Sequence, residues 1–315
     1  MSLVSSQLPD KSFNKSFNDS FNKSDKSPGS TFQNIFCLVL AVVIFVVLSI
    51  AYFYQINLLN SIGSMIGYQP KDLIATQLQL SDVLFGMTIY LKTAVDFAIL
   101  IGLLMSKYPG FKNRVVIENG TALGNTLGTM AVLTLWFFFK EVKWILALMV
   151  IIASLVLLEL AKGGLEHIEE AEREGQKVPK WVKISASKID LVLTKVMVVV
   201  SPVLSRILPS MSFDDTKKLT TWGLLGTSFT IPFILGLDDF AGYVSFFKIV
   251  NVFGFGVGVF LGHTILNILL FINPIKTVEL VKNPVISLIG TLFFVGLALF
   301  GFYEAGHSIV GLFYH

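Results

Sequence analysis

Charged residues are scarce in this chain of 315 residues: 14% are Asp, Glu, Lys or Arg, while 54% are hydrophobic. Soluble domains carry about 25% charged residues, so a globule of this size would lack polar surface, and a soluble globular enzyme is excluded. The formal net charge of +3 is too small to indicate nucleic-acid binding. The composition leaves a polytopic membrane protein as the class to consider.

Cysteine and histidine are also scarce, since the chain has one cysteine, Cys37, and four histidines. A lone cysteine excludes an intrachain disulfide, a cysteine-based zinc site and a redox relay of two thiols. The metalloprotease pattern H-E-x-x-H and the hydrolase pattern G-x-S-x-G do not occur in the sequence. We therefore expect no enzyme activity and no permanently bound cofactor.

Long apolar runs, in contrast, are abundant. About 20 apolar residues cross the roughly 30 Å of membrane hydrocarbon. One apolar stretch of this length, Ile189–Leu208, differs from seven others. It is interrupted by charged residues and Pro202, and its polar residues fall on one helical face. This pattern predicts a helix lying in the membrane interface rather than a span. The sequence predicts seven spans, at Ile35–Tyr54, Val83–Ser106, Val116–Phe139, Trp144–Ala161, Trp222–Phe247, Ile249–Ile272 and Val285–Gly306.

The basic residues follow one side of the predicted membrane. Nineteen of the 24 Lys and Arg residues fall on the side of the N-terminus and four on the other, while Lys92 lies within a span. Loops rich in Lys and Arg remain in the cytoplasm. We therefore predict a multi-pass protein of the cell inner or plasma membrane, with its N-terminus in the cytoplasm and its C-terminus outside.

Three short motifs occur twice in the same order. Each set begins with an aspartate and ends with a glutamate, which are 63 residues apart in the first set and 65 residues apart in the second. Three motifs at nearly equal spacing predict an internal repeat of three spans. The first copy contains Asp96-Phe-Ala, Gly120-x-x-x-Gly124-Asn125-Thr and Glu159, and the second contains Asp239-Phe-Ala, Gly258-x-x-x-Gly262-His263-Thr and Glu304.

The number of spans in each copy determines how the two copies are oriented in the membrane. Because three is odd, the second copy enters the membrane from the opposite side, and a pseudo-twofold axis in the membrane plane relates the two, as in many secondary transporters. The predicted fold is therefore all-α, with an N-terminal anchor and two inverted three-helix repeats. The predicted parts are a disordered cytoplasmic tail (1–33), the anchor span (34–55), repeat 1 (82–161), a charged cytoplasmic loop with the interfacial helix (162–219) and repeat 2 (220–306).

The repeated aspartates are the main candidates for a site. Ionised carboxylates in hydrocarbon cost on the order of 3 kcal/mol or more, so they are rare unless paired or facing water. Lys92 lies four residues before Asp96, which predicts an ion pair on one helical face. Asp239 has no such partner, and Asp238 adds a second carboxylate beside it. Pro232 and Gly236 predict a break or kink in the helix just before these acids. Free backbone carbonyls at the end of a broken helix, together with carboxylates, commonly bind cations.

Other repeated residues have both a functional and a structural interpretation. Asn125 and His263 follow the second glycine of each copy and either complete the site or form interhelical hydrogen bonds. Asp238 either belongs to the site or faces water. The glycine pairs are expected mainly to pack, bringing the third span to the second and the sixth to the fifth. The remaining acids are candidates for gating, or are carboxylates near a membrane surface, and comprise Glu118, Glu159 and Glu304.

The combination of an acid in the first helix of each unit and a Gly-x-x-x-Gly second helix resembles the lysine-exporter (LysE) superfamily. Its members include cadmium-resistance, tellurium-resistance-type and manganese-exporter proteins, and this chain resembles these branches. The segments that carry the resemblance are 94–98 with 120–126, and 237–241 with 258–264. The resemblance implies a six-helix core of two inverted repeats that exports a cation or small solute, with Asp96 and Asp239 at its centre.

We therefore expect a secondary transporter that exports a cation, with a divalent metal as the preferred substrate, in exchange for protons. Asp96, Asp239 and His263 would be its metal ligands, and oxygen and imidazole donors favour Mn²⁺, Mg²⁺, Ca²⁺ or Zn²⁺. Lys92 would hold Asp96 when no ion is bound. The alternatives are an exporter of an amino acid or other organic solute, and a membrane scaffold that transports nothing. The expected partners are the lipid bilayer and the transported ion or solute.

Overall fold

The computed structural model describes residues 30–313, except 109, 174, 208–218, 245–246, 248–249, 274–275, 278–279 and 281–282. The predicted tail at 1–33 lies outside this part up to residue 29, and the first helix already begins at Ser30. The described part is helical and contains no strand, so the predicted all-α class is confirmed for it. Its helices are α2 (Ser30–Met65), α3 (Leu80–Thr93), α4 (Val95–Lys107), α5 (Phe111–Phe139), α6 (Lys143–Arg173), α7 (Lys180–Ile207), α8 (Thr221–Val244), α9 (Val252–Ile272) and α11 (Pro284–Phe313), with the short 3₁₀ helix η2 (Pro70–Asp72).

Five helices of the described residues are long and apolar enough to cross a membrane. They contain the first, third, fourth and seventh predicted spans, and the sixth from Val252 onward. Helix α2 also exposes a row of valines, including Val39, Val43 and Val47. A row of this kind is unfavourable in water but suits lipid, so the described fold is that of a helical membrane protein. The five segments are Phe32–Met65, Phe111–Phe139, Trp144–Arg173, Val252–Ile272 and Pro284–Val310.

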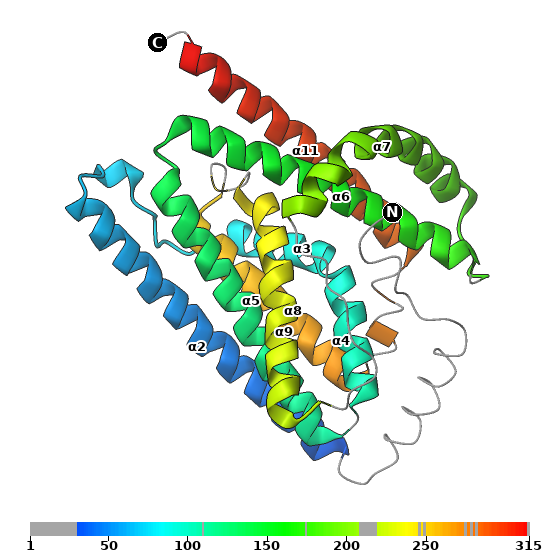
Figure 1. Ribbon diagram of the computed structural model, residues 1–315. Coiled ribbons are helices and arrows are strands. Elements are labelled where there is room, and N and C mark those ends of the chain that lie inside the picture. Colours follow the sequence, from blue (N-terminus) through cyan, green and yellow to red (C-terminus); the bar gives the residue numbers. More distant parts are fainter. Residues whose placement is uncertain are drawn as a thin grey trace.

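The second predicted span, Val83–Ser106, is not one helix. Helix α3 ends at Thr93 and α4 begins at Val95, with Ala94 between them in a turn conformation (φ −79°, ψ 15°). The Tyr90 carbonyl accepts hydrogen bonds from both the Ala94 amide and the Thr93 hydroxyl. A threonine hydroxyl that bonds a preceding carbonyl competes with the helical pattern. The expectation of a continuous span is therefore wrong, and Figure 1 shows α3 and α4 in different directions.

The fifth predicted span, in contrast, is not broken where a break was expected. Helix α8 continues from Thr221 to Val244 through Pro232 and Gly236. Neighbouring helices make proline tolerable within membrane helices, and Pro232 is buried. The prediction of a broken helix before Asp238 is therefore wrong.

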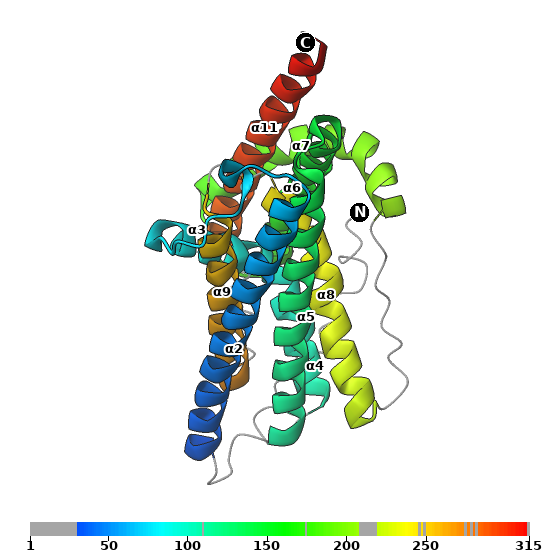
Figure 2. The ribbon, with the colours of Figure 1, turned by 90° about the vertical axis from the view of Figure 1, so that its left-hand side faces the viewer.

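Apart from α3 and α7, successive helices run in opposite directions. The colours of Figure 1 show that α2, α5, α8 and α11 run toward the upper part of the molecule and α4, α6 and α9 toward the lower part. Figure 2 shows α2, α5 and α9 side by side from another direction. The central apolar core lies among α2, α3, α5 and α9 and includes Tyr52, Leu133 and Phe255. A second core lies among α6, α7 and α11 and includes Leu157, Leu193 and Phe294.

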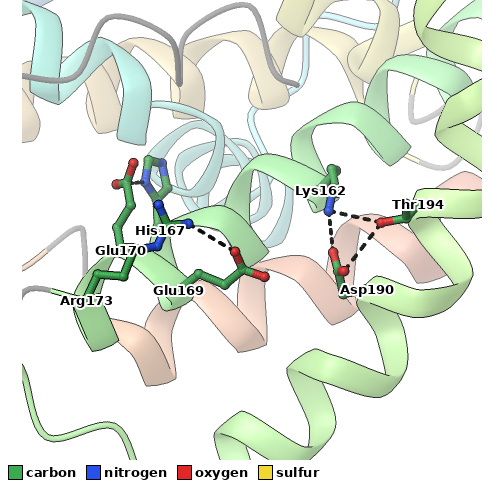
Figure 3. Close-up of polar contacts among 7 residues, drawn as sticks. All are labelled: Lys162, His167, Glu169, Glu170, Arg173, Asp190 and Thr194. Atoms are coloured by element: carbon green, nitrogen blue, oxygen red, sulfur yellow. Dashed lines mark hydrogen bonds and ion pairs between the residues drawn. The ribbon is translucent and has the colours of Figure 1, made fainter.

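The charged segment after the fourth predicted span is helical, because α6 extends to Arg173 and α7 packs against it. Lys162 of α6 pairs with Asp190 of α7 and donates to the Thr194 hydroxyl at 3.1 Å. Nearer the turn between the helices, Lys183 pairs with Glu172. These contacts show that α7 runs antiparallel along α6 (Figure 3). This arrangement does not test the prediction that α7 lies flat in the membrane interface. It shows that α7 packs along the length of α6.

Candidate functional site

Buried polar side chains from three helices meet in the centre of the molecule. His263 of α9 is 3% exposed, and its Nδ1 atom lies 2.6 Å from the Tyr90 hydroxyl of α3. The amide nitrogen of Asn267, one turn further along α9, lies 2.9 Å from His263 Nε2 and also donates to the Thr121 hydroxyl of α5 at 3.0 Å. The four side chains form a hydrogen-bonded cluster, defined here as the central polar cluster, that joins α3, α5 and α9.

The bonding of His263 bears on its predicted role as a metal ligand. Both ring nitrogens have protein partners, and because an amide N–H donates, Nε2 accepts and Nδ1 carries the proton of the neutral ring. Neither nitrogen offers a free lone pair to a metal in this arrangement. Among the described residues, no group of three or more His, Cys, Asp or Glu side chains could hold a metal ion.

Asn125 belongs to the same region of the molecule. It is 4% exposed, and in the described structure its amide nitrogen is buried without a hydrogen-bond partner. The hydrogen bond between Thr121 and Asn267 joins α5 to α9, which run in opposite directions. Asn125 is one turn after Thr121, and His263 is one turn before Asn267, so helix geometry places Asn125 and His263 at the same level.

Glu118 is buried one turn before the central polar cluster on α5, with 1% of its surface exposed. The thiol of Cys37, on α2, donates to its two carboxylate oxygens at 3.3 and 3.2 Å. The backbone carbonyl of Glu118 accepts from the Thr121 hydroxyl at 2.9 Å. The thiol of Cys37 therefore makes the hydrogen bonds that attach α2 to this acid.

Lys92 was predicted to pair with Asp96, whose side chain lies outside the described residues. Its ammonium donates to the Ile286 carbonyl of α11 at 3.1 Å. The helix break at Ala94 lies between Lys92 and Asp96, so the two residues do not share one continuous helical face. The i, i+4 spacing predicted an ion pair because it assumed one helix, and that assumption is wrong.

The side chains of the central candidates, Asp96, Asp238 and Asp239, lie outside the described residues. Their backbone positions are described: Asp96 is the second residue of α4, and Asp238 and Asp239 lie in the last turns of α8. Helix α4 contacts α5, α8 and α9. That the side chains of Asp96 and Asp239 meet at one site therefore stays a prediction.

Glu159 and Glu304 lie on α6 and α11, the two helices with the most extensive mutual contact. Both are partly buried. The two helices are held together by groups such as the Thr291 hydroxyl of α11, which donates to the Ala161 carbonyl of α6 at 3.2 Å. This arrangement does not test the gating role that was predicted for the two acids.

The repeated glycines lie where helices approach closely, but their partners differ from the predicted ones. A Cβ atom at Gly124 of α5 would lie 2.2 Å from the Phe229 carbonyl oxygen of α8. One at Gly258 of α9 would lie 2.1 Å from the Val83 carbonyl oxygen of α3. Gly120 and Gly262 belong to the same two contacts. The third predicted span therefore meets the fifth, and the sixth meets the second, so the expected pairing within each copy is wrong.

A separate contact fastens the loop between α2 and α3 to the end of α5. The Lys140 ammonium donates to the Asp72 carbonyl and lies 5.0 Å and 4.8 Å from the ring centroids of Trp136 and Phe137. Burial lowers the pKa of Lys140, while Glu141 and Asp72 oppose that shift. The contact is a cation held over aromatic faces, and it lies at the opposite end of α5 from Glu118.

Sequence reasoning missed Tyr90, Thr121 and Asn267 as members of the central polar cluster. Thr121 lies inside the first Gly-x-x-x-Gly motif, and Asn267 lies one turn after His263. Polar residues one turn from a candidate on the same helical face were the available signal. Tyr90 carried no signal, because its partner is 173 residues away in the chain.

Comparison with family models, with curated proteins and with solved structures finds no match to this chain.

Proposed function

We propose that this chain is a secondary membrane transporter, built from two inverted copies of a three-helix unit around a polar centre. In this proposal α3–α4, α5 and α6 form the first copy, and α8, α9 and α11 form the second. The opposite directions of the corresponding helices in Figure 1 agree with an inverted relation. The relationship to the LysE superfamily and the cytoplasmic position of the N-terminus are parts of the same proposal.

The helix pairing is the observation that carries the proposal. The three most extensive contacts are α6 with α11, α5 with α8, and α3 with α9. An exchange of the two copies turns the α3–α9 contact into the α8–α5 contact, and it turns the α6–α11 contact into itself. A pseudo-twofold axis requires this pattern. The close glycine approaches, at Gly124 and at Gly258, occur in the two contacts that exchange.

The proposed axis would pass close to Asn125 and His263. These are equivalent positions in the two motifs, and an axis that exchanges them must pass between them. They lie at the same level on facing antiparallel helices, as the hydrogen bond between Thr121 and Asn267 requires. Binding sites of inverted-repeat transporters lie at the repeat interface near the middle of the membrane, and the proposal assigns these buried polar side chains to such a site.

The unpartnered amide of Asn125 supports a polar substrate. A buried donor that makes no hydrogen bond costs about 1–3 kcal/mol. A substrate with an acceptor group, or with bound water, would recover this cost when it enters the centre. For the substrate itself we propose a divalent cation, with Asp96 and Asp239 as its ligands and with protons as the coupling ion. The Asn125 amide nitrogen, a donor, would bond an acceptor that accompanies the ion rather than the ion itself. Because both nitrogens of His263 are bonded, it would become a ligand only by releasing Tyr90 or Asn267.

A small organic solute is the second candidate, and the central polar cluster favours it. Tyr90, Thr121, His263 and Asn267 are neutral donors and acceptors rather than a cage of anionic oxygen atoms. Groups of this kind suit the hydroxyl, ammonium and carboxylate groups of a solute such as an amino acid. In that case Asp239 would bind the ammonium group.

Transport by the purified full chain in liposomes tests the proposal. Mn²⁺, Zn²⁺ and a set of amino acids are each offered across a pH gradient. We expect flux of a divalent cation, and we expect Asp239→Asn to reduce it to the level of liposomes without protein. Glu169→Gln, a change at an exposed acid of α6, should leave the flux intact. Flux of an amino acid alone would favour the second candidate, and no flux of any solute would contradict transport.

A further inference from the structure

Helix α7 presents three different faces. One is buried against α6 and α11 and includes Val182, Leu193 and Met197. A second carries Asp190 and Thr194, which bond to Lys162 of α6. The third face points away from the rest of the described structure and has no helix packed on it in that part of the chain. It has no equivalent in the proposed repeats, because α7 lies between them in the sequence.

The outward face of α7 combines large apolar side chains with lysines. At 100° per residue, its members fall within a narrow arc of the helix, and at 1.5 Å per residue they extend over about 26 Å. Trp181 and Val198 at its ends are 55% and 72% exposed. The members of this outward face are Trp181, Ile184, Lys188, Leu191, Val192, Lys195 and Val198, all of which are exposed.

The charge of this outward face has one sign. Asp190 is the single acidic residue in the sequence of α7, and it lies on the second face, where Lys162 pairs with it. Lys188 and Lys195 are seven residues apart, so they lie on the same side of the helix about 10 Å from each other. Apolar side chains flank both lysines around the helix. A partner must therefore supply negative charge and apolar surface along the same line.

We propose that the outward face of α7 binds the anionic headgroups of membrane lipids. Lysine side chains can extend to lipid phosphates while their stems and the neighbouring apolar residues contact the acyl boundary. Tryptophan is enriched at this level of the membrane. Helix α6, which packs against α7, is one of the helices long and apolar enough to cross a membrane, so in a membrane it would hold the outward face beside lipid. The proposal does not depend on transport.

Quenching of tryptophan fluorescence by brominated lipids tests this proposal. The full chain is placed in bilayers of phosphatidylglycerol and phosphatidylcholine, with either one lipid or the other brominated. Because the chain has four tryptophans, the signal of Trp181 is the difference between the wild type and Trp181→Phe. Each lysine near an anionic membrane surface contributes about 1 kcal/mol of attraction, which corresponds to a roughly fivefold enrichment of anionic lipid beside it. We therefore expect brominated phosphatidylglycerol to quench Trp181 several-fold more than brominated phosphatidylcholine.

Two paired variants separate specific binding from general attraction. Lys188→Gln with Lys195→Gln should remove the preference for phosphatidylglycerol. Lys71→Gln with Lys112→Gln removes the same charge at two other exposed positions and should preserve the preference. Equal quenching by the two lipids, or a preference that survives the first pair of changes, would overturn the proposal. So would the absence of quenching by either lipid, because a second copy or another protein would then cover Trp181.

Discussion

His263 and Asn125 occupy equivalent places in the two motifs but have different surroundings. His263 is bonded through both ring nitrogens, whereas the amide nitrogen of Asn125 has no partner in the described structure. A neutral imidazole that is fully bonded holds three helices together, and an unpartnered amide remains able to bind something else. In the proposed repeats, this position would therefore stabilise the packing in one copy and remain able to bind a substrate in the other.

Two glycines of the α5–α8 pair allow a prediction at the scale of the residue. Gly124→Ala would place a methyl group 2.2 Å from the Phe229 carbonyl oxygen, whereas nothing lies within 4 Å of a Cβ atom at Gly226. Because the backbone of α8 cannot move away without breaking other contacts, we expect Gly124→Ala to destabilise the fold by about 1–3 kcal/mol. Thermal unfolding in detergent measures this change.

Gly226→Ala is the matched control for that prediction. It adds the same methyl group to an exposed position of α8 and also improves the helix propensity. Its unfolding temperature should equal or exceed that of the wild type. If Gly124→Ala behaved like Gly226→Ala, the close approach of α5 and α8 would be wrong.

Some of these residues could be predicted from the sequence, and others could not. The glycines and the pair Asn125 and His263 were predictable because they recur in a motif. The bonds of Cys37 to Glu118 and of Tyr90 to His263 join residues 81 and 173 positions apart. Spacing within one helix predicts neighbours only up to about four residues away, so long-range partners of this kind gave no signal.

At the scale of the element, helix boundaries followed apolar length more closely than they followed proline. The predicted first, third, fourth and seventh spans lie within α2, α5, α6 and α11, and α9 begins three residues after the start of the predicted sixth span. The break occurred at Ala94, where the Thr93 hydroxyl bonds the Tyr90 carbonyl, and not at Pro232. Which helix a glycine motif meets depends on the packing of the whole chain, and the motif itself does not specify it.

The contact between α6 and α11 is close enough for a disulfide between two introduced cysteines. A Cβ atom at Gly164 would lie 3.8 Å from the Thr291 Cβ atom, which is the usual separation in a disulfide. Gly164→Cys combined with Thr291→Cys, in a chain with Cys37→Ala, should therefore cross-link under mild oxidation. Mass spectrometry of the peptides detects the bond.

The neighbouring glycine provides the control for the cross-link. Nothing lies within 4 Å of a Cβ atom at Gly163, so Gly163→Cys with Thr291→Cys should not cross-link under the same conditions. Equal cross-linking of both pairs would indicate mobile helices, and no cross-linking of the first pair would contradict the observed packing of α6 on α11.

At the scale of the whole molecule, the exchanged helix pairs give each proposed copy a dependence on the other. Helix α5 of the first copy packs on α8 of the second, and α9 of the second packs on α3 of the first. The centre between them includes the buried side chains of Asn125 and His263. A movement of one copy relative to the other would open this centre first to one side of the membrane and then to the other, which is alternating access.

Labelling of a single cysteine tests alternating access most directly. Asn125→Cys in a chain with Cys37→Ala leaves one thiol, at the centre of the molecule. In sealed vesicles of known orientation, a thiol reagent that cannot cross the membrane is added on one side or on the other. The account predicts slow labelling from both sides, because the centre opens to each in turn. Labelling from neither side, or from one side alone, would contradict it.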